Sequence, residues 1–440
     1  MQAATDAVSV PVVSESTRGT GGGRPAPVRI DDFVDPQFSP EVRQMLAAIE
    51  PLADTVDLTP GALMDLARGE TGLSNFGADD FVERLGVYCT SLLDEAGLSG
   101  LGRYNNQQQI LKSLKNRLLV EDLVARHPEV LDVEIRAPIV ICGLPRTGTT
   151  HLHNLMSADP ALRSLVYWES LEPVLAPSEQ PAPGEPDPRM ARTQMGLDFM
   201  HAAMPLFDRM HEMTVDHVHE EIQLLIIDFS TMLMETSVYA PSWAAYYKEH
   251  DQTSSYRYMK KVLQCCQFQR GGDRWVLKSP QHLEQFPVLV DVFPDATFVV
   301  THRDPVSVTA SLATMVTYGM RMGTAHPDPE KVGAYWADRI EEMLRACVRD
   351  RDVLPADRSI DVRFHEFMAD DMGTVERIYG LAGQPMTDAA RAAMAQFMVD
   401  HPRGRHGAIE YDLTQFALDP DERRHALRFY SDHFGVELES

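Results

Sequence analysis

The chain has 440 residues, of which 44% are hydrophobic and 24% charged, a composition typical of a globular protein. This length allows one large domain with an accessory region, or two domains. With 40 basic and 65 acidic residues the net charge is −25. Such an excess of negative charge repels phosphate backbones, so nucleic acid is not expected as a partner.

The chain carries no sign of membrane insertion or export. No apolar run is long enough for a transmembrane helix, and the N-terminus lacks a basic segment followed by an apolar one. The cysteines show no CxxC pattern, and their number is odd: Cys89, Cys142, Cys265, Cys266 and Cys347. These features favour a reducing compartment, so we expect a cytoplasmic protein.

The N-terminal third differs in pattern from the rest. Residues 1–28 are rich in Ser, Thr, Gly and Pro, which predicts a disordered tail. Residues 29–134 are predicted to form a helical accessory region, because apolar residues recur there at three- and four-residue spacing, as in "QQQILKSLKNRLLVEDLVARHP". These helices either cover the active site or form a dimer surface, so a homo-oligomer stays open.

The period changes at "APIVICGL" (137–144), a short apolar run rich in β-branched residues that is typical of a buried parallel strand. Further strands are predicted in "DRWVLKSP", "ATFVVTHRDP" and "SIDVRFHEFMAD", each followed by a helix. Several helices are predicted in residues 192–270, after a Pro-rich loop. The β–α order predicts an α/β fold for residues 135–440, a mostly parallel sheet flanked by helices as in P-loop NTPases.

The segment "GLPRTGTT" (143–150) lies between the first strand and its helix. Gly143 and Gly148 bracket four residues as in GxxxxGK[ST], but Thr149 stands at the lysine position. A glycine-bracketed turn at a helix N-terminus offers N–H groups and a positive helix end, so it should bind an anion. The cation within the loop is Arg146. No Asp ends a neighbouring strand to share Mg²⁺ with Thr150, so metal-free anion binding is predicted.

A second cation follows another predicted strand. Arg303 comes directly after "ATFVVTH", and Ser311 lies eight residues later on the helix that begins at Pro305. The hydroxyl of Ser311 can donate to the same group that Arg303 binds. Two separate cationic positions favour a nucleotide with anionic groups at two places.

Together these segments resemble the sulfotransferase superfamily, and most closely its bacterial branch with "PRxGTT", "WE", "LKSPxHL" and "RDP" motifs. The resemblance implies a P-loop-like fold. It also implies transfer of a sulfonate group from 3′-phosphoadenosine 5′-phosphosulfate (PAPS) to a hydroxyl of a small-molecule, lipid or carbohydrate acceptor, without a required metal. It covers roughly residues 136–435.

The resemblance also assigns the donor site. "GLPRTGTT" resembles the 5′-phosphosulfate loop, and "HRDPVSVTAS" the 3′-phosphate motif. "HPRGRHGAIEYDL" resembles the basic segment that covers the nucleotide, with Arg405 or His406 as helpers, and "VRFHEF" has Phe364 where many members carry tyrosine. The residues implied in donor binding are Arg146, Thr147, Gly148, Thr149, Thr150, Arg303, Ser311, Arg403 and Gly404.

Sulfuryl transfer needs cations at the transferred group and a base at the acceptor hydroxyl. Lys278 in "WVLKSP" resembles the catalytic lysine of the family, and Arg146 is expected to act beside it. Two residues compete as the base. Glu169 in "YWESLEP" stands near the place of a glutamate base in some members, whereas His282 lies four residues after Lys278 instead of two.

The segment "MHEMTVDHVHEE" adds Glu220 as a further carboxylate and a histidine cluster. His217 and His219 are two residues apart, which on a helix do not face one another, and no further ligand set follows. We therefore expect this segment to line the acceptor pocket and not to bind metal. Two other function classes stay open: a P-loop kinase using ATP and Mg²⁺, and a non-catalytic nucleotide-binding protein.

Overall fold

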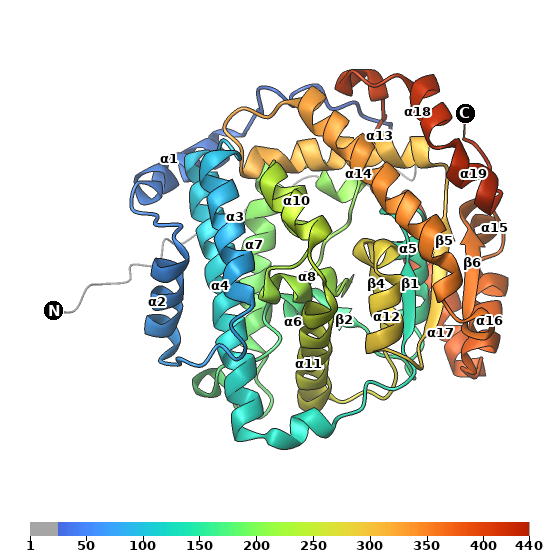
Figure 1. Cartoon of the computed structure of the whole chain (residues 1–440), viewed down its shortest axis with the longest axis horizontal. Helices are drawn as coiled ribbons and strands as arrows, with labels where there is room; N and C mark the ends of the chain where they lie inside the picture. Colours follow the sequence, from blue (N-terminus) through green and yellow to red (C-terminus); the bar gives the residue numbers. More distant parts are fainter. Residues whose placement is uncertain (1–24, 440) are drawn as a thin grey trace.

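The computed structural model describes residues 25–439 and contains one central parallel sheet (Figure 1). Its strands lie in the order β4-β1-β5-β6, and all three neighbouring pairs are parallel. The strands are β1 (Ile139–Cys142), β4 (Val276–Ser279), β5 (Thr297–His302) and β6 (Ser359–Arg363). The prediction of an α/β fold with a parallel sheet is confirmed, and the strands fall within the four predicted segments.

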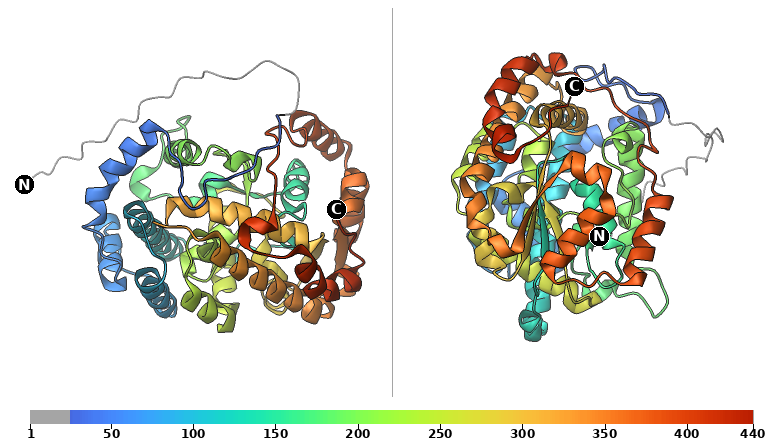
Figure 2. Two further views of the ribbon diagram at one scale, coloured as in Figure 1. Left: turned by 90° about the horizontal axis from the view of Figure 1, so that it is seen from above. Right: turned by 90° about the vertical axis from the view of Figure 1, so that its right-hand side faces the viewer.

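Helices cover both faces of this sheet (Figure 2). Successive side chains of a strand point to opposite faces. Ile139 and Ile141 therefore enter one core with helices α5 (Thr149–Ser157), α16 (Asp371–Ala382) and α17 (Asp388–Asp400). Val140 and Cys142 enter another with α12 (Phe286–Val292) and α14 (Pro329–Asp350). Burial on both faces explains the unbroken apolar run of β1. The remaining helices of this part are α13 (Pro305–Gly319), α15 (Phe364–Ala369), α18 (Pro420–Ala426) and α19 (Arg428–Phe434).

The N-terminal helical region lies on the left in Figure 1. It packs against the helices of residues 165–270, which we call the middle segment. Its helices are α1 (Pro40–Ala53), α2 (Pro60–Thr71), α3 (Phe81–Asp94) and α4 (Gly100–Arg126). Arg84 and Arg117 each donate to buried Asp228 at 2.6 Å, which ties α3 and α4 to the middle segment. Leu118 shares one hydrophobic core with Val140 of the sheet, so the predicted boundary at residue 134 does not separate two cores.

Most of the predicted tail, residues 1–24, lies outside the described residues. Residues 25–28 are described, and they do not stand apart from the fold. Val28 forms a parallel bridge with Ile409, and its N–H donates to the carbonyl of Ala408 at 3.1 Å. Residues 25–28, which fall within the predicted tail, thus contact the C-terminal part of the fold.

The middle segment, residues 165–270, lies in the chain between α5 and β4. It contains a two-stranded antiparallel sheet, β2 (Leu165–Val166) with β3 (Val218–His219). Its helices are α6 (Tyr167–Leu171), α7 (Pro188–Ala203), α8 (Ile222–Leu225), α9 (Leu233–Ser237), α10 (Pro241–Glu249) and α11 (Thr253–Arg270). Among the described residues, none of the helices combines the length and apolar character needed to cross a bilayer.

Candidate active site

The loop after β1 has the shape expected of an anion-binding turn. Arg146 and Gly148 adopt the left-handed region, with φ of +70° and +88°. A Cβ on Gly143 would lie 2.0 Å from the hydroxyl oxygen of Thr301, so this position requires glycine. Helix α5 begins directly after Gly148, and the first-turn residues Thr149 and Thr150 line a cavity of about 810 Å³. Unpaired N–H groups of a first helical turn suit an anion.

Three predicted donor-site residues form one cluster, of which Arg146 and Arg303 line this cavity and Ser311 is buried beside Arg146. Arg146 donates from Nε to Ser311 Oγ at 3.0 Å, and Arg303 donates from Nη1 to the carbonyl of Arg146 at 2.7 Å. The guanidinium of Arg303 lies 4.1 Å from the ring centre of Phe364. Phenylalanine at the usual tyrosine position therefore contributes a cation–π contact to this cluster.

The guanidinium of Arg303 already holds a carboxylate. Glu439 accepts from its Nε at 2.5 Å and from its Nη2 at 2.7 Å, and the N–H of Glu439 donates to Asp304 at 2.8 Å. A two-point contact of this kind is the geometry that an arginine also offers to phosphate. A phosphate at Arg303 must therefore displace Glu439.

The late basic segment contributes part of the cavity wall. Arg403 and Gly404 line it, and Arg403 is paired with Asp371. The two suggested helpers, Arg405 and His406, both pair with Glu212 and are not among the lining residues.

Thr147 has no free hydroxyl toward the cavity. Its Oγ1 lies 2.7 Å from the carbonyl of Leu144 and 2.7 Å from the hydroxyl of Thr301, and the residue is buried. Of this predicted ligand, only the backbone N–H is left to bind an anion.

Lys278 lies between the loop and the acidic segment. It pairs with Ile141 in the register of β4 on β1, which places it near the end of the sheet that carries the loop. Only 3% of its surface is exposed, and its ammonium contacts the carboxylate of Glu220 and, at 3.4 Å, the hydroxyl of Thr150. Both partners line the cavity. The sheet thus delivers one buried cation to the start of α5.

His282 is buried behind this cation. Its Nε2 lies 2.6 Å from Glu221, and its Nδ1 lies 2.9 Å from the hydroxyl of Tyr256. The other oxygen of Glu221 accepts from the backbone N–H of Lys278 at 2.9 Å. With both ring nitrogens engaged and no exposed surface, His282 supports the position of Lys278 through Glu221. The structure does not bring it to the cavity.

Glu169, the other candidate base, is also outside the cavity lining. It is 1% exposed and forms ion pairs with Arg163 at 2.7 Å and with Arg270 at 3.0 Å. These arginines stack on Trp275 and Trp168 respectively. Its surroundings resemble a structural ion cluster more than a site that meets an acceptor.

Glu220 is the carboxylate that the structure brings to the cavity, although the sequence offered it only as a third choice. It follows β3 directly, and its neighbour Glu221 is the buried partner of His282. Glu221 already has the right-handed helical backbone that begins α8, and the two adjacent side chains have different partners, Lys278 for Glu220 and His282 for Glu221.

The histidine cluster has a different geometry from the one expected. The reasoning that His217 and His219 do not face one another assumed a helix and is wrong, because His217 directly precedes β3 and His219 is its last residue, so this segment is not helical. Their ring nitrogens lie 2.9 Å apart. Burial lowers the pKa of His211 to about 3 and that of His219 well below its usual range, with nearby histidine and Lys278 charge adding to the effect. In residues 25–439 no group of three or more His, Cys, Asp or Glu could hold a metal ion.

The rest of the cavity is largely apolar. This wall comprises Met200, Phe207, Met213, Ile222, Met232, Leu233, Leu312, Met315 and Ile409. Gln109 of α4 also lines the cavity. Of the two roles left open for the N-terminal helices, α4 thus contributes to covering the site. The methionines of the 199–213 segment line the cavity at Met200 and Met213, in addition to filling the core.

Comparison with known proteins gives consistent matches. The family model described as "Sulfotransferase family" matches residues 138–388. Two solved structures are similar in fold: sulfotransferase STF9 from Mycobacterium avium, and sulfotransferase STF1 from Mycobacterium tuberculosis H37Rv. STF9 has a TM-score of 0.77 and 28% identity, covering 87% of this chain and 98% of that one. STF1 has a TM-score of 0.71 and 30% identity, covering 83% and 97%.

A curated relative extends this comparison. The omega-hydroxy-beta-dihydromenaquinone-9 sulfotransferase Stf3 of Mycobacterium bovis is 24% identical over 302 residues, which cover 64% of this chain and 71% of that protein. The family match extends over more than half of the chain and includes the loop, Lys278 and Arg303. The chain accordingly belongs to the sulfotransferase family.

Proposed function

We propose that this sulfotransferase moves a sulfonate group from PAPS to the hydroxyl of an alcohol acceptor. The observation that carries the proposal is the position of Lys278. Its ammonium lies between Thr150, at the start of the anion-binding helix, and Glu220, which faces the same cavity. A preorganised cation at the point where charge develops is the main requirement of such a transfer.

The donor residues fall into two groups. The backbone N–H groups of residues 147–150 bind the 5′-phosphosulfate at the start of α5. Arg303 and Ser311 bind the 3′-phosphate, and Arg146, which contacts both of them, links the two ends. Arg403 and Gly404 close the cavity over the nucleotide. PAPS fits this set because the two anionic groups of the nucleotide meet two separate groups of donors.

In the reaction the acceptor oxygen attacks sulfur in line, and the bond between sulfur and the bridging oxygen of the 5′-phosphate breaks. The sulfonate passes to the acceptor, and 3′-phosphoadenosine 5′-phosphate leaves with the electron pair. Lys278 stabilises the negative charge that develops on that bridging oxygen. We assign the base to Glu220, not to Glu169 or His282, because a base must reach the proton that it removes.

An alcohol acceptor is also supported by the relative, whose name describes a sulfotransferase acting on a hydroxylated menaquinone. The mostly apolar wall of the cavity agrees with an acceptor that has a hydrophobic body. The three arginines of the donor site are bound to other groups in this structure, so the affinity for nucleotide is the first property to measure.

The proposal is tested by calorimetric titration with 3′-phosphoadenosine 5′-phosphate and, separately, with ATP and Mg²⁺, each with and without EDTA. We expect the bisphosphate to bind with a dissociation constant that EDTA does not change, and Arg303→Ala to weaken it. Binding of ATP that requires Mg²⁺, with no binding of the bisphosphate, would favour the kinase alternative and contradict the proposal.

A further inference from the structure

A second cavity, of about 270 Å³, adjoins the main one. The two share five lining residues: Gln109, Phe207, Thr236, Ser237 and Met315. We call the second cavity the distal chamber. Its other lining residues are Asn105, Asn106, Met204, Val316, Gly319, Met322 and Gly323. Glu220 lines the main cavity but not the distal chamber, so a molecule that occupies both extends from Glu220 past the shared residues.

Apart from Gln109, the polar side chains that line the distal chamber already have partners within the protein. Asn105 donates to the carbonyl of Met322 at 3.0 Å, and Asn106 donates to Gly102 at 2.8 Å and accepts from Tyr88 at 3.0 Å. The hydroxyls of Thr236 and Ser237 both donate to the carbonyl of Leu233. An apolar occupant therefore leaves these groups with their hydrogen bonds, which removes the usual cost of covering them.

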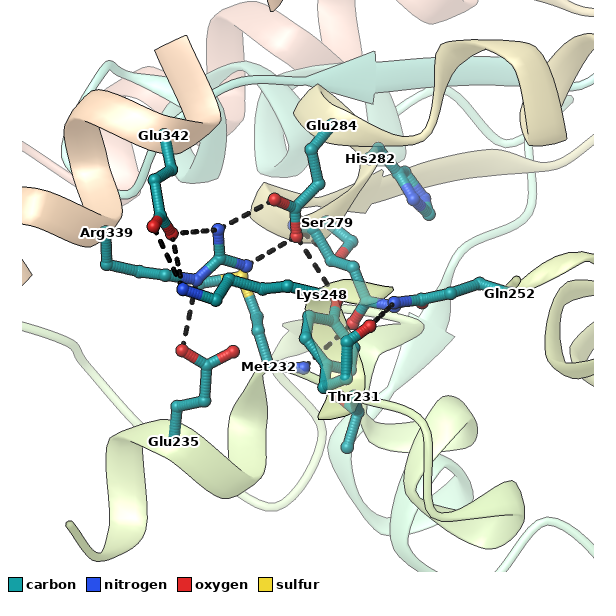
Figure 3. Close-up of polar contacts among 12 residues, drawn as sticks. Thr231, Met232, Glu235, Lys248, Gln252, Ser279, His282, Glu284, Arg339 and Glu342 are labelled. Carbon is teal, nitrogen blue, oxygen red and sulfur yellow. Dashed lines mark hydrogen bonds and ion pairs between the residues drawn. The ribbon is translucent and has the colours of Figure 1, made fainter. Parts of the chain in front are cut away.

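The segment of residues 232–237, which contributes to the lining of both cavities, is held in place by hydrogen bonds and an ion pair. The N–H of Met232 donates to Gln281 at 3.0 Å, and Glu235 accepts from Arg339 at 3.1 Å. Figure 3 shows Arg339 between Glu235 and Glu284, and it donates to Glu284 at 2.6 and 2.7 Å. Residues 232–237 are thus anchored to the segment that follows Lys278, so the chamber is preformed and has a fixed position relative to the ammonium.

We propose that the distal chamber receives the tail of a long, unbranched or prenyl-like alcohol whose hydroxyl lies at Glu220 and Lys278. This inference rests on the proposed sulfonate transfer and names its acceptor class. The affinity for an alcohol should rise with the length of its tail, because apolar surface that leaves water stabilises the complex. Short, strongly polar or sugar acceptors bury no apolar surface in the chamber and should bind no more tightly because of it.

Gly319 offers a direct way to fill the chamber. It is the last residue of α13, and a Cβ at this position meets no atom within 4 Å. Gly319→Leu therefore places a side chain in open space without touching the donor residues. The matched control is Gly380→Leu, because Gly380 is also helical, also has no atom within 4 Å of an added Cβ, and is exposed on α16.

The experiment measures KM and kcat with prenol, geraniol and farnesol under saturating PAPS. In the unaltered protein and in Gly380→Leu, KM should fall by at least about tenfold with each added isoprene unit, since even one methylene in an apolar pocket is commonly worth that much. In Gly319→Leu the gain from geraniol to farnesol should disappear, while prenol turnover and bisphosphate affinity stay unchanged. A KM that is independent of chain length, or a farnesol preference that survives in Gly319→Leu, overturns the inference.

A second measurement separates this inference from the proposed function. If no alcohol is sulfonated, the proposed function fails, but farnesol can still be titrated into protein saturated with 3′-phosphoadenosine 5′-phosphate. Calorimetric binding of farnesol that is lost in Gly319→Leu and kept in Gly380→Leu supports the chamber by itself. Absence of farnesol binding, or equal binding in both variants, contradicts it.

Discussion

Two glutamates of this protein are both paired with cations but differ in their access to the cavity. Glu169 is 1% exposed and is paired with Arg163 and Arg270, outside the cavity lining. Glu220 contacts a single cation, Lys278, and lines the cavity. A carboxylate held between two guanidinium groups has its oxygens engaged by those partners. Pairing with a cation therefore does not distinguish the two carboxylates, whereas access to the cavity does.

The largest effect should come from removing the cation on the cavity side. Lys278→Ala is expected to lower kcat by roughly a thousandfold, because loss of one preorganised group at the developing charge costs on that order. Bisphosphate affinity should stay nearly intact, as Arg303 and the loop are untouched. Steady-state kinetics with calorimetry measure both quantities. Turnover unchanged in Lys278→Ala would remove Lys278 from the mechanism.

The two glutamates themselves are compared with the same substitution. Glu220→Gln should lower kcat by about a hundredfold, since loss of a general base costs at least this much. Glu169→Gln should leave kcat of the folded protein within about threefold, yet lower the free energy of unfolding by about 3 kcal/mol, because it removes one member of a buried ion cluster.

Kinetics and urea unfolding on both variants decide this comparison. A loss of turnover in Glu169→Gln at normal stability, together with an active Glu220→Gln, would reverse the two assignments. The pH dependence of the residual rate adds a second criterion. A rate that no longer rises with pH in Glu220→Gln is the result expected of a lost base.

Two histidines near Lys278 should also lower the free energy of unfolding at acid pH. Burial lowers the pKa of His153 and His211 to about 3, and the charge of Lys278 adds to the effect. These histidines stay neutral in the folded protein, while the unfolded chain protonates them below about pH 6.5. The stabilising contribution is therefore present above that pH and is lost as the pH falls toward 3, by up to about 1.4 kcal/mol per pH unit and histidine.

Urea unfolding at a series of pH values measures this slope. His153→Gln should make it shallower, because one fewer histidine takes up a proton on unfolding. An identical slope in His153→Gln would show that the acid response arises elsewhere.

The smallest effect concerns the carboxylate at the donor site. Glu439→Gln frees Arg303 from a partly exposed ion pair, whose side chains are 22% and 34% exposed. Such pairs are worth up to about 1 kcal/mol, so bisphosphate should bind up to about fivefold more tightly. Calorimetry measures the change, and Glu437→Gln, which alters an exposed residue of the same segment, is the control. Weaker binding in Glu439→Gln alone would show that Glu439 supports the donor site.

The sheet and the loop could be predicted because their signals are local. The apolar run before Gly143 and the apolar run that leads into Lys278 are sequence features that specify buried parallel strands. The glycine spacing specifies the turn, since Gly143 leaves no room for a side chain beside Thr301. In a parallel sheet the carboxyl ends of the strands meet at one edge, so Arg146, Lys278 and Arg303 could be placed near each other without a structure.

The acceptor side could not be predicted in the same way. Glu169 and Glu220 follow similar short elements, and only the packing of α6 and β3 decides that one meets two arginines and the other the cavity. Likewise, the contact of Gln109 and Asn106 with the cavities depends on how α4 packs on a segment more than a hundred residues away. Motifs of a few residues encode backbone shape and local charge, whereas the direction of a side chain depends on long-range contacts. The sequence thus determined the family fold and the donor loop, and the tertiary structure alone decided which carboxylate meets the acceptor and how far the acceptor cavity extends.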